Sequence, residues 1–194
     1  MRTALLALLL ALAPAASAQL LPSVDFGVTG GLNFSSLGDA AGLDLGQSTG
    51  YHVGAYAEVG VGGLGIRPAV LYVKAGEIAF PGFGDESVGF FAIPVDLKYS
   101  ASTPLVQPYG LLGPELRIPT GEVFDRDGTR STAVALNVGA GARLGAFIGP
   151  SVSAELRYSF DVTGFVEDTA LFGAGGADES FRFNVFYVRV GVAI

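Results

Sequence analysis

Ten charged side chains fall on the polar positions of alternating stretches, and these are the residues best placed to do chemistry. They are Glu58, Arg67, Asp96, Lys98, Glu115, Arg117, Arg143, Glu155, Arg157 and Arg189. If the polar faces enclose an interior, each charge needs a partner, since an unpaired buried ion costs several kcal/mol. The residue types therefore favour a set of mutually neutralising ion pairs that fills the interior. A gated path for ions is the alternative.

The only histidine, His52, is the one candidate for a general base. It lies on the polar side of its stretch, but no nucleophile motif or set of metal ligands accompanies it. A histidine that fills space or lies at a rim is therefore favoured over a catalytic one. The run 125–128, Asp-Arg-Asp-Gly, lacks the further spaced carboxylates of a calcium loop and is typical of a turn. We predict no catalytic, cofactor-binding or metal-binding residues and no cofactor.

Residues 151–163 show most clearly the kind of element that carries these charges. One face takes every second residue: Val152, Ala154, Leu156, Tyr158, Phe160 and Val162. The other face is polar and includes Glu155 and Arg157. Because side chains alternate along a β-strand, this pattern predicts a strand that is apolar on one side and charged on the other. It is long enough to cross a membrane at a tilt, which takes roughly 9–11 residues.

The same alternation recurs along the chain. It covers residues 24–34, 50–59, 64–75, 88–99, 106–118, 133–144 and 181–194, which makes eight predicted strands with 151–163. Long connections (35–49, 76–87, 119–132 and 164–180) alternate with short ones (60–63, 100–105 and 145–150). This is the pattern of an outer-membrane barrel with short periplasmic turns and longer extracellular loops. An even number of strands then places both termini in the periplasm.

Aromatic residues on the apolar faces support the membrane interpretation. Phe34, Tyr51, Tyr72, Phe91 and Phe160 all fall near the long-connection ends of their strands. They form one predicted aromatic girdle at a membrane interface. Tyr99 and Phe147 would belong to the opposite girdle.

Residues 1–18 are predicted to be a secretory signal peptide. Arg2 supplies the positive start, residues 5–13 the apolar run, and Ala16-Ser17-Ala18 the cleavage site. The mature domain is then 19–194. The chain has no cysteine, which excludes disulfides, thiol chemistry and a lipid anchor on a cysteine after the cleavage site.

Composition agrees with an exported membrane barrel. Hydrophobic residues make up 50% of the chain and charged residues only 15%, and Lys74 and Lys98 are the only lysines. A soluble β-protein usually carries many more lysines on its exposed surface.

The charge balance limits the partners. Eleven Lys and Arg stand against 18 Asp and Glu, and loss of Arg2 leaves a net charge near −8, which argues against nucleic acid. The long connections carry Asp39, Asp44, Glu77, Asp85, Glu86, Glu122, Asp125, Asp127, Glu167, Asp168, Asp178 and Glu179, but only Arg126 and Arg130. Solvated loop tips are favoured over cation bridging to lipid headgroups or capture of a basic ligand. We expect outer-membrane lipid and the outer-membrane assembly machinery as partners, with an extracellular ligand left open.

Two features predict irregular pairing. Pro68, Pro94, Pro108 and Pro114 lie inside predicted strands, and proline cannot donate to the ladder, so each implies a bulge or a missing hydrogen bond. In the last strand Val185 falls out of phase with the later valines, which predicts a bulge near Phe186.

Several runs resemble the PorT-like outer-membrane β-barrel family of Bacteroidetes and related bacteria. They are VTGGLN (28–33), IRPAVLYVKAG (66–76), AIPVDLKY (92–99), PYGLLGPEL (108–116), VGAGARL (138–144) and ELRYSFDVTG (155–164). The resemblance spans nearly the whole mature chain and implies an outer-membrane barrel. Ala69 stands where such sequences often carry an acidic residue, and Ile194 where outer-membrane strands commonly end in an aromatic. The founding member is associated with protein secretion, a role that we do not transfer to this chain.

Together these observations predict an all-β, eight-stranded, antiparallel up-and-down transmembrane barrel without enzymatic activity. Its interior would be plugged by ion pairs, and its role structural, surface-binding or accessory. A narrow transport or secretion-accessory barrel is one alternative. A soluble lipocalin-like barrel with an apolar ligand cavity is another. The direction in which the charged faces point separates the last from the rest.

Overall fold

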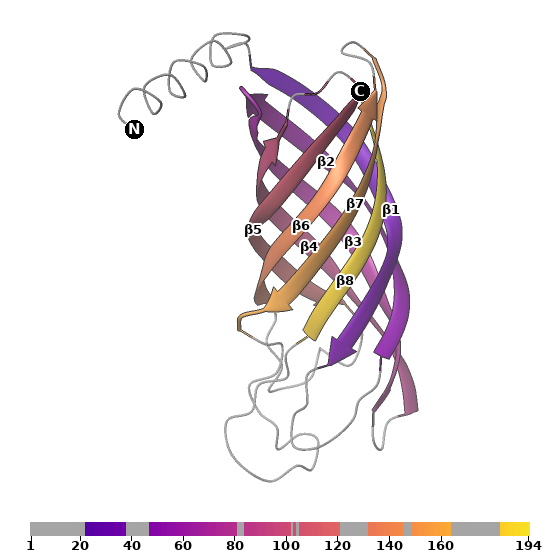
Figure 1. Ribbon diagram of the computed structural model, residues 1–194. Coiled ribbons are helices and arrows are strands. Elements are labelled where there is room, and N and C mark those ends of the chain that lie inside the picture. The colour runs from indigo at the N-terminus through magenta and orange to yellow at the C-terminus, as the bar shows by residue number, and fades with distance from the viewer. Residues whose placement is uncertain are drawn as a thin grey trace, which may run out of the picture.

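A computed structural model describes residues 22–37, 47–80, 84–101, 103, 105–120, 132–145, 149–163 and 183–194 (Figure 1). The strands close into one barrel in sequence order, and the last pairs with the first. All neighbouring pairs are antiparallel. This confirms the predicted up-and-down barrel of eight strands. The predicted signal peptide, residues 1–18, lies outside the described residues.

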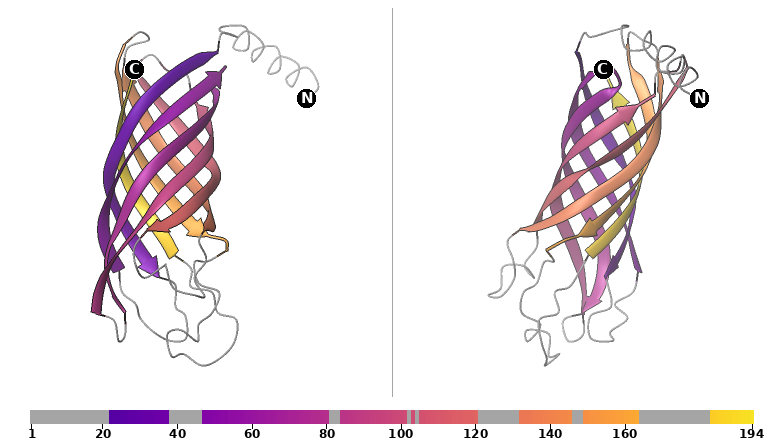
Figure 2. Two further views of the ribbon diagram at one scale, coloured as in Figure 1. Left: turned by 180° about the vertical axis from the view of Figure 1, so that it is seen from behind. Right: turned by 60° about the vertical axis from the view of Figure 1, so that its left-hand side comes forward.

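The strands are long and run obliquely around the barrel (Figure 2). They are β1 (Ser23–Leu37), β2 (Gln47–Val61), β3 (Leu64–Phe80), β4 (Gly84–Ser100), β5 (Val106–Thr120), β6 (Ala133–Gly145), β7 (Ser151–Asp161) and β8 (Phe183–Ala193). We call the end with the connections after β2, β4 and β6 the turn end, and the opposite end the loop end. The start of β1 and the C-terminus both lie at the turn end (Figures 1 and 2).

Apolar side chains cover the outside of the barrel and polar ones fill its inside. Val138 and Leu156, for example, are 51% and 54% exposed on the outer wall, whereas Asp96, Glu115 and Arg117 are fully buried within. In water this arrangement would expose the hydrocarbon surface and bury the charges, so the surrounding solvent must be lipid. The soluble lipocalin-like alternative is therefore wrong. Among the described residues, no helix is long and apolar enough to span a membrane.

The connection between β3 and β4 differs from the predicted loop over 76–87. Both strands continue through this region, and Phe80 pairs with Gly84 across the hairpin. The ladder shifts register between Lys74 and Gly76, and Gly76 has a φ of 98°. Gly76 therefore forms a β-bulge within the hairpin, because glycine adopts positive φ without strain. The hairpin projects beyond the ends of neighbouring strands (Figure 1).

Three of the four prolines that were predicted to lie inside strands coincide with gaps in the pairing. Two residue pairs are missing beside Pro68 on the β2 side, beside Pro94 on the β3 side and beside Pro114 on the β4 side. In each case pairing resumes in the same register, so the prolines weaken the ladder without creating bulges. Pro108 lies within a continuous pairing of β5 with β6.

The bulge predicted near Phe186 is absent. β8 pairs with β1 without interruption from Phe183 to Ala193, and with β7 from Val185 onward. Val185 simply points inward and is fully buried. The loop end of the interior also holds Val73 and Phe90, so apolar side chains are accepted there beside the polar ones.

Candidate functional site in the barrel interior

The ten charged residues singled out in the sequence all face the interior. Nine are buried, and Arg143 is partly buried near the turn end. The structure adds Asp25 and Asp161, which occupy polar positions near strand ends and form ion pairs with members of the set. The described interior thus holds six cations (Arg67, Lys98, Arg117, Arg143, Arg157, Arg189) and six anions (Asp25, Glu58, Asp96, Glu115, Glu155, Asp161). Their formal charges cancel.

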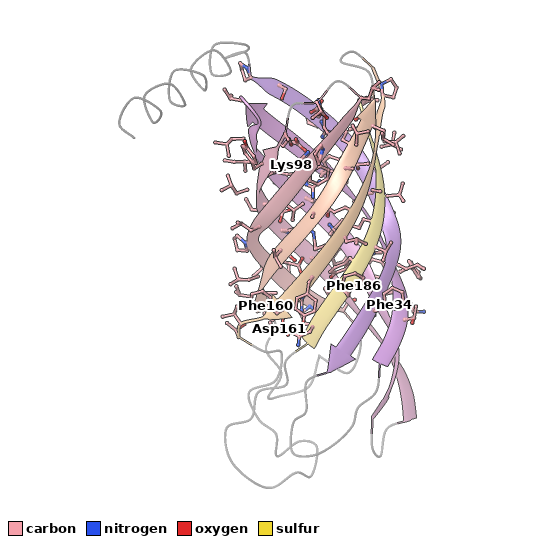
Figure 3. The ribbon with its side chains drawn as sticks, in the orientation of Figure 1. Phe34, Lys98, Phe160, Asp161 and Phe186 are labelled. Carbon is pink, nitrogen blue, oxygen red and sulfur yellow. The ribbon has the colours of Figure 1, made fainter. Side chains whose placement is uncertain are left out.

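The ion pairs fall into three clusters along the barrel axis, and the first lies at the turn end. Arg143 bridges Asp25 at 3.1 Å and Glu58 at 3.0 Å. Lys98 donates to both oxygens of Glu58 at 2.8 Å. This cluster links β1, β2, β4 and β6 near the mouth of the barrel. Figure 3 shows Lys98 on this side of the interior, away from Asp161 at the other end.

The middle cluster is the most densely connected. Arg157 donates to both oxygens of Asp96, at 2.6 and 3.3 Å, and to Glu155 at 3.1 Å. Arg67 binds the other oxygen of Glu155 at 2.5 Å, and Tyr109 donates to that same oxygen at 3.1 Å. Charge-assisted bonds of this kind are stronger than neutral ones, and the bidentate geometry also fixes orientation. These side chains come from β3, β4, β5 and β7, so they connect strands that are not neighbours.

The third cluster lies toward the loop end and centres on Arg117. Its guanidinium donates to Glu115 at 2.7 Å, to Asp161 at 2.7 Å and to Ser159 at 2.5 Å. Asn137 donates to the second oxygen of Glu115 at 3.1 Å. All of these groups are buried, and each nitrogen of the Arg117 guanidinium has a hydrogen-bond partner within the cluster.

Aromatic rings lie beside the buried cations, including Tyr109, which occupies the polar face of its strand. Lys98 lies over the ring of Tyr109 at 4.2 Å, and Arg117 over Phe90 at 5.2 Å. Such contacts stabilise cations that have been withdrawn from water. The interior thus holds inward aromatics as well as charges, as a barrel of this size can be filled by side chains alone.

The five residues predicted to form the girdle point outward near the loop end, and the structure adds Tyr158 and Phe186. Rings meet in pairs: Phe34 with Phe186 at 6.4 Å, and Tyr72 with Phe91 at 5.6 Å. Phe160 lies 6.3 Å from Tyr158, and Tyr51 is also exposed. Figure 3 shows Phe34, Phe160 and Phe186 at one level of the outer wall. Tyr99 is exposed at the turn end, whereas Phe147 lies outside the described residues.

His52 lies inside the barrel and is 2% exposed. Its ring meets that of Tyr187 edge-on at 5.1 Å. Neither ring nitrogen has a hydrogen-bond partner among the described residues. Within the same residues, no group of three or more His, Asp or Glu has the arrangement of a metal site. Residues 125–128 lie outside the described part of the chain.

The described interior has a cavity at the turn end and a much smaller one deeper in. The cavity at the turn end is about 360 Å³ and is lined by Asp25, Gln107, Arg143, Ser151 and Ile194 among others. Deeper in, a cavity of about 10 Å³ lies between Arg67, Glu155 and Arg189. The second has room for about one water molecule, so the ion-paired clusters obstruct the barrel beyond its mouth.

Comparison with known proteins defines the class. Residues 3–193 match the model of the outer membrane protein beta-barrel domain. The chain belongs to this family and is an outer-membrane β-barrel protein. No match is found among curated proteins.

One solved structure agrees in fold, and two others match with lower TM-scores. Neisserial surface protein A (NspA) is similar with a TM-score of 0.65 at 16% identity, covering 90% of this chain and 98% of that one. Ail of Yersinia pestis gives 0.49 at 13%, covering 89% and 99%. OprG of Pseudomonas aeruginosa gives 0.42 at 12%, covering 89% and 96%. At these identities the likeness to NspA concerns the fold alone.

Proposed function

We propose that this protein is a closed, non-catalytic outer-membrane barrel that holds acidic loops at the cell surface for a binding or accessory role. The observation that carries the proposal is the neutral, ion-paired interior. Its ion pairs link strands that are not neighbours and so fix the strands from which the loops emerge. A rigid scaffold that positions variable loops is a common way to build a binding surface.

The distribution of charge supports the assignment of function to the loop end. Because the interior charges cancel, the net charge near −8 of the mature chain belongs to the other residues. These are the twelve carboxylates of the predicted long connections, together with Lys74, Arg126, Arg130 and Arg182. A surface of this kind would stay solvated and would favour basic groups on a ligand. The ligand itself is left open.

We further infer that the turn end faces the periplasm. The start of β1 and the C-terminus share this end, and its connections (62–63, 101–105 and 146–150) are short, whereas three of the four at the loop end (38–46, 121–132 and 162–182) are longer (Figure 1). Cleavage after Ala18 would leave both termini on that side. Epitope tags test this. A tag within 121–131 should be detected on intact cells and a tag after Ile194 only on permeabilised cells; the reverse pattern overturns the orientation.

Within the family, the resemblance of runs such as 66–76 and 92–99 supports a PorT-like relationship. The expected partners are outer-membrane lipid around the apolar wall and the assembly machinery during insertion. The C-terminal isoleucine, Ile194, allows the interaction with the assembly machinery to be tested. Ile194→Phe should leave assembly at least as efficient, measured as the fraction of chain that shows heat-dependent electrophoretic mobility. A loss of folded barrel in that variant would show that recognition does not follow the aromatic-end rule.

Conductance in planar bilayers tests the closed interior. The wild-type barrel should give no steady single-channel current, because Arg157 and Asp96 obstruct the axis of the barrel. The double variant Arg157→Ala/Asp96→Ala should open a narrow path and give measurable current. Val138→Ala, on the lipid-facing wall, serves as the matched control and should remain silent. Steady current through the wild-type protein would overturn the proposal in favour of a transport barrel.

The non-catalytic proposal has its own test at His52. The purified barrel is incubated with outer-membrane lipid and the lipid is analysed by mass spectrometry. We expect no lipid product, and the same result with His52→Ala. Deacylated or transacylated lipid that disappears with His52→Ala would overturn the proposal.

A further inference from the structure

Buried polar atoms without hydrogen-bond partners gather on one side of the interior. Among the described residues, they belong to Asn33, Ser35, His52, Asn137, Tyr187 and Arg189. All but Asn137 come from β8, β1 and β2, which are adjacent in the barrel. Each of these five side chains is at least nine-tenths buried. We call them the unpaired polar group.

Members of the unpaired polar group contact one another. Gly31 pairs with His52 on one side and with Arg189 on the other, and Asn33 pairs with Tyr187. The His52 and Tyr187 rings are 5.1 Å apart, and the Arg189 guanidinium carbon lies 4.7 Å from the Tyr187 ring. Gly31 contributes no side chain between its neighbours, so part of the wall behind the group is bare backbone.

Two buried arginines show the contrast between the sides of the interior. Arg117 uses Nε, Nη1 and Nη2 in hydrogen bonds to Glu115, Asp161 and Ser159. Arg189 makes one long ion pair, 3.6 Å from Nη1 to Glu155, while its Nε and Nη2 have no partner among the described residues. The same functional group is thus fully satisfied on one side and mostly unsatisfied on the other.

This imbalance identifies the kind of ligand that would fit. A buried polar group left unsatisfied costs about 1–3 kcal/mol, so several together require a partner. Arg189 and Tyr187 can donate, whereas the Asn33 carbonyl oxygen and the Ser35 hydroxyl can accept, so the ligand must do both. The interior charges already cancel, which favours a neutral ligand over an anion. The cavity of about 10 Å³ beside Arg189 has room for about one water molecule.

We propose that the unpaired polar group binds ordered water, with one molecule in the cavity beside Arg189. The interior then has two parts: the ion-paired clusters, and a hydrated part along β8, β1 and β2 that borders the middle cluster at the cavity beside Arg189. His52 serves as a water ligand in the hydrated part. This inference does not depend on the proposed surface role, because a barrel with any loop function would have the same interior.

Water exchange measured by NMR on the mature, refolded protein in detergent micelles tests this proposal. The Nε–H resonances of Arg189 and Arg117 are assigned with the variants Arg189→Lys and Arg117→Lys. Arg189 should show a direct cross-peak to water and exchange at least about tenfold faster than Arg117, which is the protection that one hydrogen bond can give. Equal protection of the two arginines would overturn the proposal.

Two further measurements distinguish bound water from a dry interior and from a bound halide. His52→Phe removes polar ligands from the group and should slow exchange at Arg189, whereas Ser159→Ala in the ion-paired part should leave it unchanged. If His52→Phe folds and the Arg189 Nε–H exchanges with water at the wild-type rate, the result counts against the proposal. If that variant does not fold, the comparison of Arg189 with Arg117 in the wild-type protein decides. Replacing chloride by gluconate at constant ionic strength should not shift the Arg189 resonance. A shift would identify a bound halide in place of water.

Discussion

Arg157 on β7 and Asp96 on β4 are joined by two hydrogen bonds, 2.6 Å from Nη2 to Oδ2 and 3.3 Å from Nη1 to Oδ1. The strands that carry them are not neighbours, since β5 and β6 lie between. Both side chains are fully buried, so the pair connects two separated parts of the wall through the interior. Each charge needs the other for compensation, because neither side chain can reach water.

Removal of one partner should therefore be costly. We expect Asp96→Ala to lower the free energy of unfolding by about 3–5 kcal/mol, because Arg157 would be left as a poorly compensated buried charge. Urea unfolding in lipid vesicles, followed by the heat-dependent mobility shift, measures the change. Asp25→Ala is the matched control: its side chain is 30% exposed at the turn end, so less than about 1 kcal/mol is expected. Equal losses in the two variants would contradict this account of the interior.

The outer wall predicts a depth-dependent cost for charge. Val138 points outward in the middle of β6 and is 51% exposed, so Val138→Arg should cost about 2–4 kcal/mol. Leu144 points outward near the turn end of the same strand, and Leu144→Arg should cost about 0–1 kcal/mol, because arginine reaches the interface there. The same unfolding assay in vesicles compares the two. A tolerated arginine at position 138 would mean that this part of the wall does not face lipid.

The paired aromatics near the loop end should contribute beyond their apolar area. Phe34 and Phe186 are in register on β1 and β8, with ring centroids 6.4 Å apart. We expect Phe34→Leu to lower the free energy of unfolding by about 0.5–1.5 kcal/mol, the range of an aromatic pair. Val28→Leu on the same face of β1 keeps an aliphatic side chain and should change stability little. Indistinguishable effects of the two substitutions would argue against the girdle.

The bulge in the β3–β4 hairpin depends on one glycine. The backbone at Gly76 has a φ of 98°, which side-chain-bearing residues rarely adopt. A Cβ added there would also lie 2.8 Å from the carbonyl oxygen of Thr49. Gly76→Val should therefore cost about 2 kcal/mol or more, because strain and crowding act together. Gly62 also has positive φ, but no atom lies within 4 Å of the position that a Cβ would take there, so Gly62→Ala should cost only about 1 kcal/mol. Chemical denaturation of both variants measures whether Gly76→Val loses more stability than Gly62→Ala. The opposite order would show that position 76 can adopt an ordinary strand conformation.

The fold could be predicted from the alternation of apolar and polar residues, because successive side chains of a strand between lipid and a polar interior face lipid and interior in turn. The same rule placed Glu115 and Arg117 on the inner face. It failed over 76–87, where Gly76, Pro81 and Gly82 indicated a loop although the strands continue past a bulge. It also failed at Val185, whose apolar side chain is accepted inside because that end of the interior is not purely ionic.

Which charged residues pair with which could not be predicted from the sequence, for a geometric reason. Arg157 reaches Asp96 only because closure and strand tilt bring β7 opposite β4, and alternation within a strand carries no information on that. The inward orientation of Asp25 and Asp161 could have been predicted, since each occupies a polar position at the end of an alternating run. The contrast between Arg189 and Arg117 lies in their hydrogen-bond partners, and alternation within a strand does not specify those partners either.

The distance along the chain between ionic partners has a consequence for biogenesis. Arg67 and Glu155 are separated by 88 residues, and Arg143 and Asp25 by 118. A sheet that still lacked its last strands would present bare guanidinium and carboxylate groups to hydrocarbon. Insertion of one hairpin at a time into open bilayer is therefore unfavourable for this chain. Its charged face must remain wet until β8 meets β1, and whatever factor guides the nascent sheet must shelter that face until the ring is complete.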